Sequence, residues 1–534
     1  MIIKMCLKLQ VGSSLIVLAC AGQALAAPAQ SVSVSEAASR FSGIPLPQEM
    51  RKLLGSRRPF QSVSLGGVTP GPTPFIANVS EDFSGNPLTY AYSIVYSKSG
   101  SYVRPVISGY SANYLSSQGR LSATNVSVPV FGLYAGSQNK VAIVLFFQSG
   151  SAAVSFLPVT TAAYSDPCGA LNSPTVQNNR KATSDLSFDY FLMKDSCSAN
   201  SPAIIDTDGN LRWVGTTNVG TQSAILYNSA VYSSDNSSGV NRTDLATGVV
   251  TKFADYRASD GVTFTGHHNY DPGRDGIVID VNTTAQTESV NLEIDGTTGK
   301  VLNRWDLFDI ISAAMRAGGD DPTQFASTDP NRDWFHNNAT TYNPADNTLI
   351  VSSRENFVIA VDYDTPADGV KKIHWILGDP TKNWHRFASL QKFALQLAPG
   401  TLPPIGQHAV SIDHKGNLLL FDDGQSSFNQ SPAGETRNYS AARSYKIDTT
   451  AMTATGDFLY SPQPSIYSDI CSSIYERGSG NYLVDFSTAN NRSLNELQGL
   501  GSNNNVVFDL QYAAVNGCGT GWNSIPVSLN KRFR

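Results

Sequence analysis

The sequence predicts an all-β fold class: an N-terminal β-sandwich followed by a six-bladed β-propeller. Two observations lead to this prediction. Short strands of alternating apolar and polar residues fill positions 61–165, with turn residues between them. From position 198 to about 525, a phrase of strand, turn and strand recurs. The composition agrees, because 43 Gly, 22 Tyr and 24 Phe suit a β-rich chain with many turns, and 534 residues are enough for two domains.

Residues 1–26 predict a signal peptide. Two lysines in "MIIKMCLK" precede the apolar "LIVLACAG" and the small residues "ALAAPAQ", and cleavage is expected near Ala26 or Ala27. A competing interpretation is that "VLAC", ending at Cys20, resembles a bacterial lipoprotein box, which would attach the mature chain to a membrane through lipidated Cys20. Both interpretations imply export. No later segment approaches the ~20 apolar residues of a membrane-spanning helix.

Two regions follow the signal peptide. Residues 27–60 form an N-terminal extension in which only a short helix, around 47–54, is expected. Residues 61–165 form the predicted β-sandwich domain, and the phrase "YSDPCGALNSP" follows as a linker. The strand-like runs of this domain are "TYAYSIVY", "SVPVFGLY", "KVAIVLFF" and "AAVSFLPV".

Residues 166–534 contain the repeat that predicts the propeller. Each unit has a strand, a turn and a second strand, and six units follow one another, the last five at spacings of about 45–70 residues. They are "AIIDTDGNLRWVG", "SAILYNSAVYSS", "NYDPGRDGIVIDVN", "TYNPADNTLIVSS", "SIDHKGNLLLFDDG" and "SIYERGSGNYLVDFS". A second large sandwich is the alternative, but radial repetition of sheets protects their edges and favours the propeller. One insertion, "DLFDIISAAMRAGG" (306–319), predicts a short helix.

Charge and cysteine content narrow the function classes. The net charge is −5, with 15% charged residues and no basic stripe, which argues against nucleic acid as a partner. The four cysteines after the signal peptide suggest disulfides in an oxidising compartment, and local pairs, Cys168 with Cys197 and Cys471 with Cys518, are expected, although the sequence does not fix the pairing. No C-x-x-C occurs, which argues against a thiolate metal site.

Histidines precede the inner strand of three repeat units. They are found in "TGHHNYDPGRDG" (His267 and His268), "DWFHNNATTYNPADN" (His336) and "GQHAVSIDHKG" (His408). His268 and His408 each lie eight positions before the turn glycine of their unit. Since innermost strands line the channel of a propeller, these imidazoles are expected to converge at one end of the channel.

Asn338 and Arg354 belong to the same pattern. Asn338 follows His336 by two positions, and Arg354 ends the second strand of that unit, in "VSSRENF". Each residue alone has an ordinary explanation: a turn residue for Asn338, and an ion pair with Glu355 for Arg354. The remaining histidines, His374, His385 and His414, are interpreted as ordinary surface or core residues.

Such a cluster allows three kinds of function. Three imidazoles could hold zinc in a hydrolase or lyase, although no His-x-His or His-x-x-x-His chelate occurs and Arg354 would repel a cation. Imidazoles, an amide and a forked guanidinium could instead bind an oxyanion, and one histidine could be a nucleophile in covalent group transfer. A ligand-binding propeller without catalysis is the third alternative.

Several phrases resemble the bacterial arylsulfotransferases, a family that is independent of the nucleotide sulfate donor. The resemblance covers about 75–525. Its specific parts are "DWFHNN" to "SSR" and "GQHAVSIDHKGNLLLFDDG", and weaker parts are "VPVFGLY…NKVAIVLFF" and "HWILGDPTKNW". The resemblance implies a periplasmic six-bladed propeller with an N-terminal β-sandwich, often dimeric. It also implies transfer of a sulfuryl group from an aryl sulfate donor to a phenolic acceptor, through a sulfohistidine and without metal or cofactor.

The resemblance also implies roles for individual residues. His408 matches the nucleophile, while His336, Asn338 and Arg354 match the sulfate-binding block. The remaining family histidine falls in "GHHN", where spacing favours His268 as the catalytic residue and leaves His267 with substrate binding. This sequence departs from the family in reading "HNNAT" after Phe335 and in having no cysteine close to His408 along the chain, so no redox requirement is expected near the site.

Overall fold

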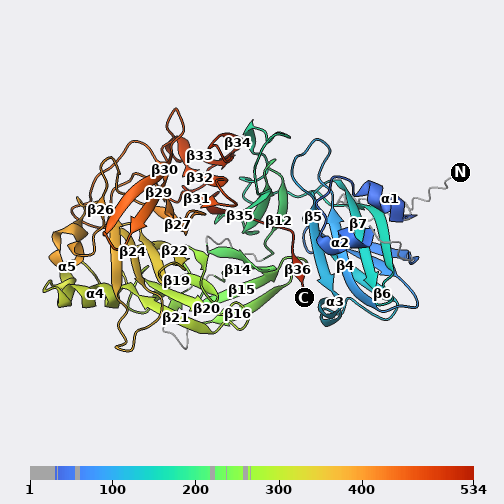
Figure 1. Ribbon diagram of the computed structural model, residues 1–534, viewed down its shortest axis with the longest axis horizontal. Helices are drawn as coiled ribbons and strands as arrows, with labels where there is room; N and C mark the ends of the chain where they lie inside the picture. The colour runs from blue at the N-terminus through green and yellow to red at the C-terminus, as the bar shows by residue number, and fades with distance from the viewer. Residues whose placement is uncertain are drawn as a thin grey trace, which may run out of the picture.

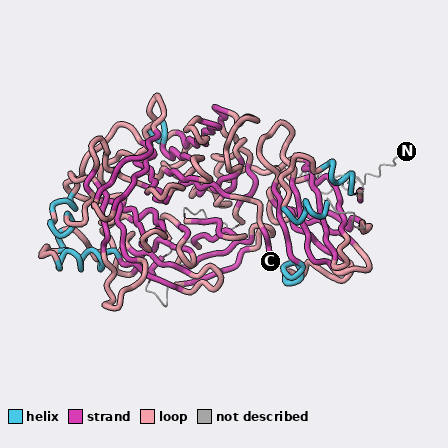
Figure 2. Tube along the Cα trace, viewed as in Figure 1, coloured by secondary structure: helices cyan, strands magenta, loops and turns pink. Residues whose placement is uncertain are grey.

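The computed structural model describes residues 30–32, 34–54, 60–216, 223–235, 237–256, 262–264 and 266–534. The predicted signal peptide and Cys20 lie outside the described residues. Strands dominate the molecule, which has a smaller N-terminal lobe and a larger lobe (Figure 1). Most helices lie at the two ends of the long axis (Figure 2).

The N-terminal lobe contains two sheets. The smaller sheet has the strands β2 (Ser64–Pro70), β3 (Ile76–Asp82) and β6 (Asn125–Phe131). The larger has, in spatial order, β1 (Gln30–Ser31), β8 (Ala152–Thr160), β7 (Gln138–Phe147), β4 (Leu88–Val95), β5 (Val106–Ser111) and β36 (Arg532–Phe533). Buried side chains of both sheets, including Val79, Val128 and Ile143, form one apolar cluster. The four strand-like runs of the sequence thus correspond to β4, β6, β7 and β8.

The extension before this lobe is tied to it. β1 pairs antiparallel with β8, and the helices α1 (Val34–Arg40) and α2 (Gln48–Leu54) follow. α2 covers the expected short helix. Ala37 and Phe41 are buried against Tyr92 and Ile94 of the larger sheet, so the extension covers a face that would otherwise expose apolar side chains.

The larger lobe is built from six further sheets of four or five strands among the described residues. Their strands, grouped by sheet, are as follows: β35 (Trp522–Val527), β10 (Tyr190–Lys194), β11 (Ala203–Asp206) and β12 (Leu211–Val214); β13 (Ala224–Tyr227), β14 (Ala230–Ser234), β15 (Gly239–Asp244) and β16 (Val250–Asp255); β17 (Val262–Phe264) and β18 (Tyr270–Pro272), both paired with β19 (Ile277–Thr283), then β20 (Val290–Ile294) and β21 (Val301–Asp306); β22 (Asn337–Asn343), β23 (Thr348–Ser353), β24 (Phe357–Asp362) and β25 (Ile373–Gly378); β27 (His408–Ile412), β28 (Leu418–Asp422), β29 (Ala441–Asp448), β30 (Thr453–Tyr460) and β26 (Gln396–Leu397); β31 (Ser473–Glu476), β32 (Tyr482–Thr488), β33 (Leu494–Leu500), β34 (Val506–Ala513) and β9 (Thr175–Asn178). Except for β26 with β30, the pairs in these sheets are antiparallel.

Turn chemistry explains why the repeat was visible in the sequence. In "DHKGN", the Asp413 carboxylate accepts hydrogen bonds from two backbone N–H groups of the turn, and Gly416 has a φ of +82°. In "DTDGN", Asp206 does the same and Gly209 has a φ of +83°. An Asp that caps a tight turn and a Gly that tolerates positive φ therefore recur wherever such a hairpin is made.

One repeat unit occupies a different position from the others. Five of the six units form the first two strands of their sheets, but "AIIDTDGNLRWVG" forms β11 and β12, the far pair of its sheet. The first strand there is β35, which comes from the end of the chain and pairs with β10. The sheet is thus completed by strands from opposite ends of this region.

The first strands of the six sheets form a continuous series. β13 contacts β18, β18 contacts β22, β22 contacts β27, β27 contacts β31, and β31 contacts β35. β10, the partner of β35, contacts β13 again. The side chains at either end of these strands are therefore brought together although they are far apart in the chain.

Helices are short and peripheral. α4 (Leu307–Ala317) fulfils the prediction made from "DLFDIISAAMRAGG", and Asp306 caps its N-terminus by accepting from Asp309 N. The others are α3 (Ala112–Ser117), α5 (Ala388–Gln391), α6 (Ala489–Arg492), and the 3-10 helices η1 (Pro322–Gln324) and η2 (Asn383–Arg386). Among the described residues, no helix has the length and apolar character needed to span a membrane.

Both expected disulfides are present, Cys168–Cys197 and Cys471–Cys518. They are consistent with a protein that folds in an oxidising compartment.

Candidate active site

The three sequence-predicted histidines meet at one end of the first strands. His268 lies just before β18, His336 lies just before β22, and His408 is the first residue of β27. The ring centroids of His268 and His336 are 4.5 Å apart. Trp522, the first residue of β35, lies 4.9 Å from the ring of His268 and 5.9 Å from that of His408. Four strands thus bring four ring side chains into one cluster.

The backbone at this end takes conformations that most side chains avoid. His336 has a φ of +56° and Ala409, next to His408, a φ of +57°. Non-glycine residues with positive φ are held in that conformation by surrounding contacts, and they concentrate at functional sites. The carbonyl oxygen of His336 accepts a hydrogen bond from the backbone N–H of Arg354 at 3.0 Å. This bond holds the backbone of His336 next to that of Arg354.

His408 is held as one defined tautomer. Its Nδ1 lies 3.0 Å from the carbonyl oxygen of Gly406 and also contacts a carboxylate oxygen of Asp423. Because a carbonyl oxygen can only accept, Nδ1 carries the proton and Nε2 keeps a lone pair. Burial, together with the charges of Arg354 and His336, lowers the pKa of His408 well below 6.5. The imidazole is therefore neutral at neutral pH, with Nε2 available as a nucleophile.

His336 is in the opposite electrostatic state. Its Nδ1 lies 2.7 Å from Glu288 Oε2 and 2.5 Å from Asp333 Oδ2. Burial alone would lower the pKa of His336, but the two carboxylates outweigh it and raise the pKa to about 10. Burial likewise works to raise the pKa of Glu288, and His336 outweighs it and lowers that pKa. His336 is thus an imidazolium with Nδ1 committed to carboxylates and Nε2–H available to a ligand.

Arg354 has donors without partners. Its Nη1 donates to Glu355 Oε1 at 2.6 Å, so the ion pair expected from the sequence is present. Its Nε and Nη2 are buried and have no hydrogen-bond partner among the described residues. The ring of Phe428 lies against the guanidinium, 3.8 Å from its central carbon. Buried donors without partners are costly, and a forked pair of them fits an oxyanion.

Asn338 holds the segment that carries His408. Its Nδ2 donates to the carbonyl oxygen of Gln407 at 2.8 Å, and Ser352 Oγ donates to the same oxygen at 3.1 Å. The side chain of Gln407 donates in turn to Ser353 O. Asn338 is fully buried, and its Oδ1 has no partner in the described part of the chain.

The two neighbouring histidines differ in their contacts. The Nδ1 atoms of His267 and His268 lie 2.7 Å apart, so one of them donates to the other. The ring of His268 packs against the rings of His336 and Trp522. The ring of His267 packs against that of His268. Burial lowers the pKa of His267 to about 4 and that of His268 well below 6.5, so both are neutral.

Two sets of three side chains at this end have ligand atoms close enough together to bind a metal ion. They are His267, His268 and Glu288, and Glu288, Asp333 and His336, each with its ligand atoms within 4.8 Å of one another. A cation at the second group would have to displace the proton of an imidazolium stabilised by two carboxylates. The protonation of His336 therefore favours an anion at this site.

Sequence reasoning missed four contributors to the cluster. Asp423 lies within the quoted "FDDG" and Asp333 precedes His336 by three positions, but no pattern distinguished them. Trp522 lies in "GWNSI", an aromatic-containing phrase that suggested a loop able to hold a phenol but no place beside the histidines. Glu288 comes from the connection between β19 and β20, where nothing in the sequence suggested a role. Glu288 and Trp522 reach the histidines from other sheets, which spacing along the chain does not encode.

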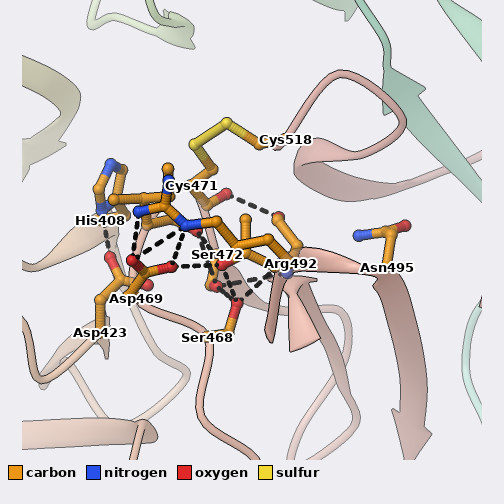
Figure 3. Close-up of a disulfide and its surroundings, with 12 residues drawn as sticks. His408, Asp423, Ser468, Asp469, Cys471, Ser472, Arg492, Asn495 and Cys518 are labelled. Atoms are coloured by element: carbon orange, nitrogen blue, oxygen red, sulfur yellow. Dashed lines mark hydrogen bonds and ion pairs between the residues drawn. A yellow bond between two sulfur atoms is a disulfide. The ribbon is translucent and has the colours of Figure 1, made fainter. Parts of the chain in front are cut away.

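The disulfide Cys471–Cys518 is closer to His408 than the sequence suggested. Cys471 is next to Ser472, whose hydroxyl works against the burial that raises the pKa of Asp423, the residue that contacts His408. Figure 3 draws the disulfide in the same cluster of side chains as His408 and Asp423. The expectation that no cysteine lies near His408 holds along the chain but not in space. The other histidines are ordinary in their contacts: His374 and His414 pair with Asp362 and Glu476, and His385 packs on Trp384.

Comparisons with known proteins agree on one family. The family model described as "Arylsulfotransferase (ASST)" matches residues 174–522, which is more than half of the chain. Two curated relatives are named "Arylsulfate sulfotransferase AssT". The one from Escherichia coli O6:H1 (strain CFT073) is 28% identical over 238 residues, covering 36% of this chain and 38% of the relative. The one from Lelliottia amnigena is 26% identical over 207 residues, covering 29% and 32%.

The matched part spans about a third of the length of these relatives. Among solved structures, a Bacteroides thetaiotaomicron protein of unknown function is 12% identical, with a TM-score of 0.34, covering 86% of this chain and 99% of that chain.

Proposed function

Since this chain belongs to the arylsulfotransferase family, we propose that it transfers a sulfuryl group from an aryl sulfate ester to a phenolic acceptor, through a sulfohistidine at His408. The observation that carries the proposal is the pairing of a neutral nucleophile with an unfilled oxyanion site. His408 is buried and neutral, with its lone pair on Nε2, and Arg354 beside it has two buried donors without partners.

In the first half-reaction, Nε2 of His408 attacks the sulfur of the donor. The N–S bond forms as the S–O bond to the aryl group breaks, and negative charge grows on the peripheral oxygens as in phosphoryl transfer. Arg354 Nε and Nη2 are the donors for that charge, and the imidazolium of His336 adds its positive charge nearby. A preorganised donor of this kind lowers the activation barrier by about 3–4 kcal/mol. His336 Nε2–H gives its proton to the leaving phenolate.

In the second half-reaction, the roles of His336 reverse. Neutral His336 takes the proton of the acceptor phenol, the phenol oxygen attacks sulfur, and the N–S bond breaks to restore neutral His408. A phenol has a pKa of about 10, like the tyrosine side chain, and the pKa of His336 is also about 10. Proton transfer between the phenol and His336 is therefore close to balanced in free energy.

Other residues have supporting roles in this proposal. His268 contributes a neutral imidazole to the sulfuryl site, and His267 fixes the tautomer of His268 through the 2.7 Å contact. Asn338 positions His408 by holding Gln407 O, and its free Oδ1 faces no protein donor among the described residues. Trp522 offers a flat face to the aryl group between His268 and His408.

We also propose the domain arrangement that suits this function. Residues 166–534 form a six-bladed β-propeller, which the contacts between successive first strands support, and residues 61–165 form a β-sandwich, which the apolar cluster shared by two sheets supports. Residues 27–60 are an extension of the sandwich. The disulfides support export to the periplasm.

Initial rates with a chromogenic aryl sulfate and a phenol test the proposal. Varying both substrates should give the parallel double-reciprocal lines of a ping-pong scheme, and His408→Ala should abolish transfer while its melting temperature stays close to that of the unaltered protein. His414→Ala, a histidine that pairs with Glu476 instead, is the matched control and should keep full activity. Intersecting lines, or substantial transfer by His408→Ala, would refute the covalent scheme.

A further inference from the structure

A cavity lies at the end of the first strands opposite the histidine cluster. Its volume is about 520 Å³, within the range of about 300–1,000 Å³ that is usual for small-molecule sites. Each of the six strands that begin near the histidine cluster contributes to it with residues toward its other end. Its walls include Leu226, Pro272, Tyr342, Ile412, Tyr475 and Val527.

Two cationic residues line this cavity. Arg477 follows β31 and is exposed, and Lys531 lies between β35 and β36 and is partly buried. No ion pair is formed by either side chain within the described residues. Burial, together with the nearby charge of Arg477, lowers the pKa of Lys531 to about 8. Two cations that face one cavity repel each other, and both would gain from an anion between them.

The acidic group of the cavity is occupied by other contacts. Asp271 accepts hydrogen bonds from Thr340 N at 2.8 Å, from Thr340 Oγ1 at 3.2 Å and from Asn269 Nδ2 at 2.9 Å. Burial raises the pKa of Asp271 to about 6, and the buried Lys194 works against that rise. Its negative charge is therefore balanced from within the protein, and Arg477 and Lys531 dominate the charge offered to a ligand.

A layer of buried polar residues separates this cavity from the histidine cluster. Lys194 and Asn269 are fully buried, and Lys194 Nζ donates to Asn269 Oδ1. Asn269 lies between His268, which belongs to the cluster, and Asp271, which lines the cavity. A ligand in the cavity therefore does not reach His408, and the cavity is a separate site.

We propose that this cavity binds an aromatic organic anion, a compound with a flat apolar body and one sulfate, sulfonate or carboxylate group. The apolar and tyrosine walls receive the ring, and Arg477 and Lys531 bind the anionic group. This inference goes beyond the proposed function and does not rest on it, because it needs no group transfer.

Calorimetric titration of the full chain with 2-naphthalenesulfonate tests the inference. This probe carries its sulfur on a C–S bond, so it cannot donate a sulfuryl group to His408. The unaltered protein should bind two molecules, one at each site. The double variant Arg477→Ala with Lys531→Ala should bind one molecule, at the catalytic site. Its affinity for the probe at the cavity should be reduced at least about tenfold. The same double variant should keep its transfer rate at saturating donor, because neither residue contacts the catalytic cluster.

Matched variants separate this cavity from the catalytic site. Arg386→Ala combined with Lys446→Ala removes the same charges from exposed positions outside the cavity and should still bind two molecules. Arg354→Ala should lose only the molecule at the catalytic site. Leu226→Trp, which fills the cavity without changing charge, should lose the same molecule as the Arg477 and Lys531 double variant.

The inference is overturned if the unaltered protein binds a single molecule that Arg354→Ala abolishes, or if the Arg477 and Lys531 double variant still binds two. It is also overturned if inorganic sulfate displaces the probe from this cavity at an equal concentration, because the apolar walls would then contribute nothing.

Discussion

Replacing Glu288 with glutamine should change the pH at which the enzyme loses activity. Glu288 is one of two carboxylates that contact Nδ1 of His336, and Glu288→Gln keeps the shape of the side chain while removing its charge. The imidazolium of His336 is the proposed acid for the leaving phenolate. That form is fully present below the pKa of His336 and is lost as the pH rises through it, so the rate should fall on the basic side.

The size of the effect follows from the contacts of His336. The two carboxylates outweigh the effect of burial and raise its pKa from 6.5 to about 10, a net effect of about 5 kcal/mol in favour of the charged form. If the two carboxylates share this effect about equally, losing one charge should move the basic limb down by about two pH units. At neutral pH the variant should keep most of its rate, because His336 remains largely protonated there.

The assay is the rate of phenol release in the first turnover, measured without acceptor between about pH 6 and pH 11. An aryl sulfate has no group that titrates in this range, so the limb reports the protein. Asp362→Asn, which removes the carboxylate partner of the exposed His374, is the matched control and should leave the profile unchanged. If Glu288→Gln loses activity at the same pH as the unaltered protein, His336 is not the proton donor.

Three other predictions concern the same site. Arg354→Lys should lower the rate about 10²–10³-fold despite keeping the charge, because an ammonium cannot replace both Nε and Nη2; full activity would remove Arg354 from the sulfuryl site. Asp423→Asn should slow formation of the intermediate at least about hundredfold with little change in donor KM, because an amide can also donate to Nδ1 and so favour the wrong tautomer of His408; an unchanged burst rate would argue that Gly406 O alone fixes the tautomer. Dialysis against a chelator should leave transfer unchanged, since the protonated His336 and Arg354 favour an anion; loss of activity that added zinc restores would instead support a metal-dependent hydrolase or lyase.

The parts of the fold that could be predicted from sequence are those with local causes. Hairpin turns such as Asp413–Gly416 require an Asp cap and a Gly at positive φ, and α4 requires a cap and an apolar face, so both were visible as patterns. The assignment of "AIIDTDGNLRWVG" to the far pair of its sheet was not visible, because it depends on β35 pairing with β10 across most of the region. A pattern identifies a hairpin, but only long-range pairing decides where the hairpin lies in the sheet.

The same distinction applies to the candidate site. His268, His336 and His408 were predictable because each precedes the same strand of its repeat unit, and equivalent positions in successive sheets converge. Glu288, which contacts His336, comes from a connection outside the repeated phrases. Asp423, which contacts His408, lies within one of the phrases, but no equivalent residue in the other phrases suggested that role. Spacing could therefore locate the clustered histidines and not the carboxylates that contact them.

The most direct test of the account is a mass spectrum of the protein after incubation with 4-nitrophenyl sulfate and no acceptor. The account predicts an acid-labile gain of one SO₃ on the peptide that contains His408, present in His414→Ala, absent in His408→Ala, and removed when a phenol is added. Release of 4-nitrophenol at full rate without any adduct on that peptide would contradict the sulfohistidine and with it the central claim.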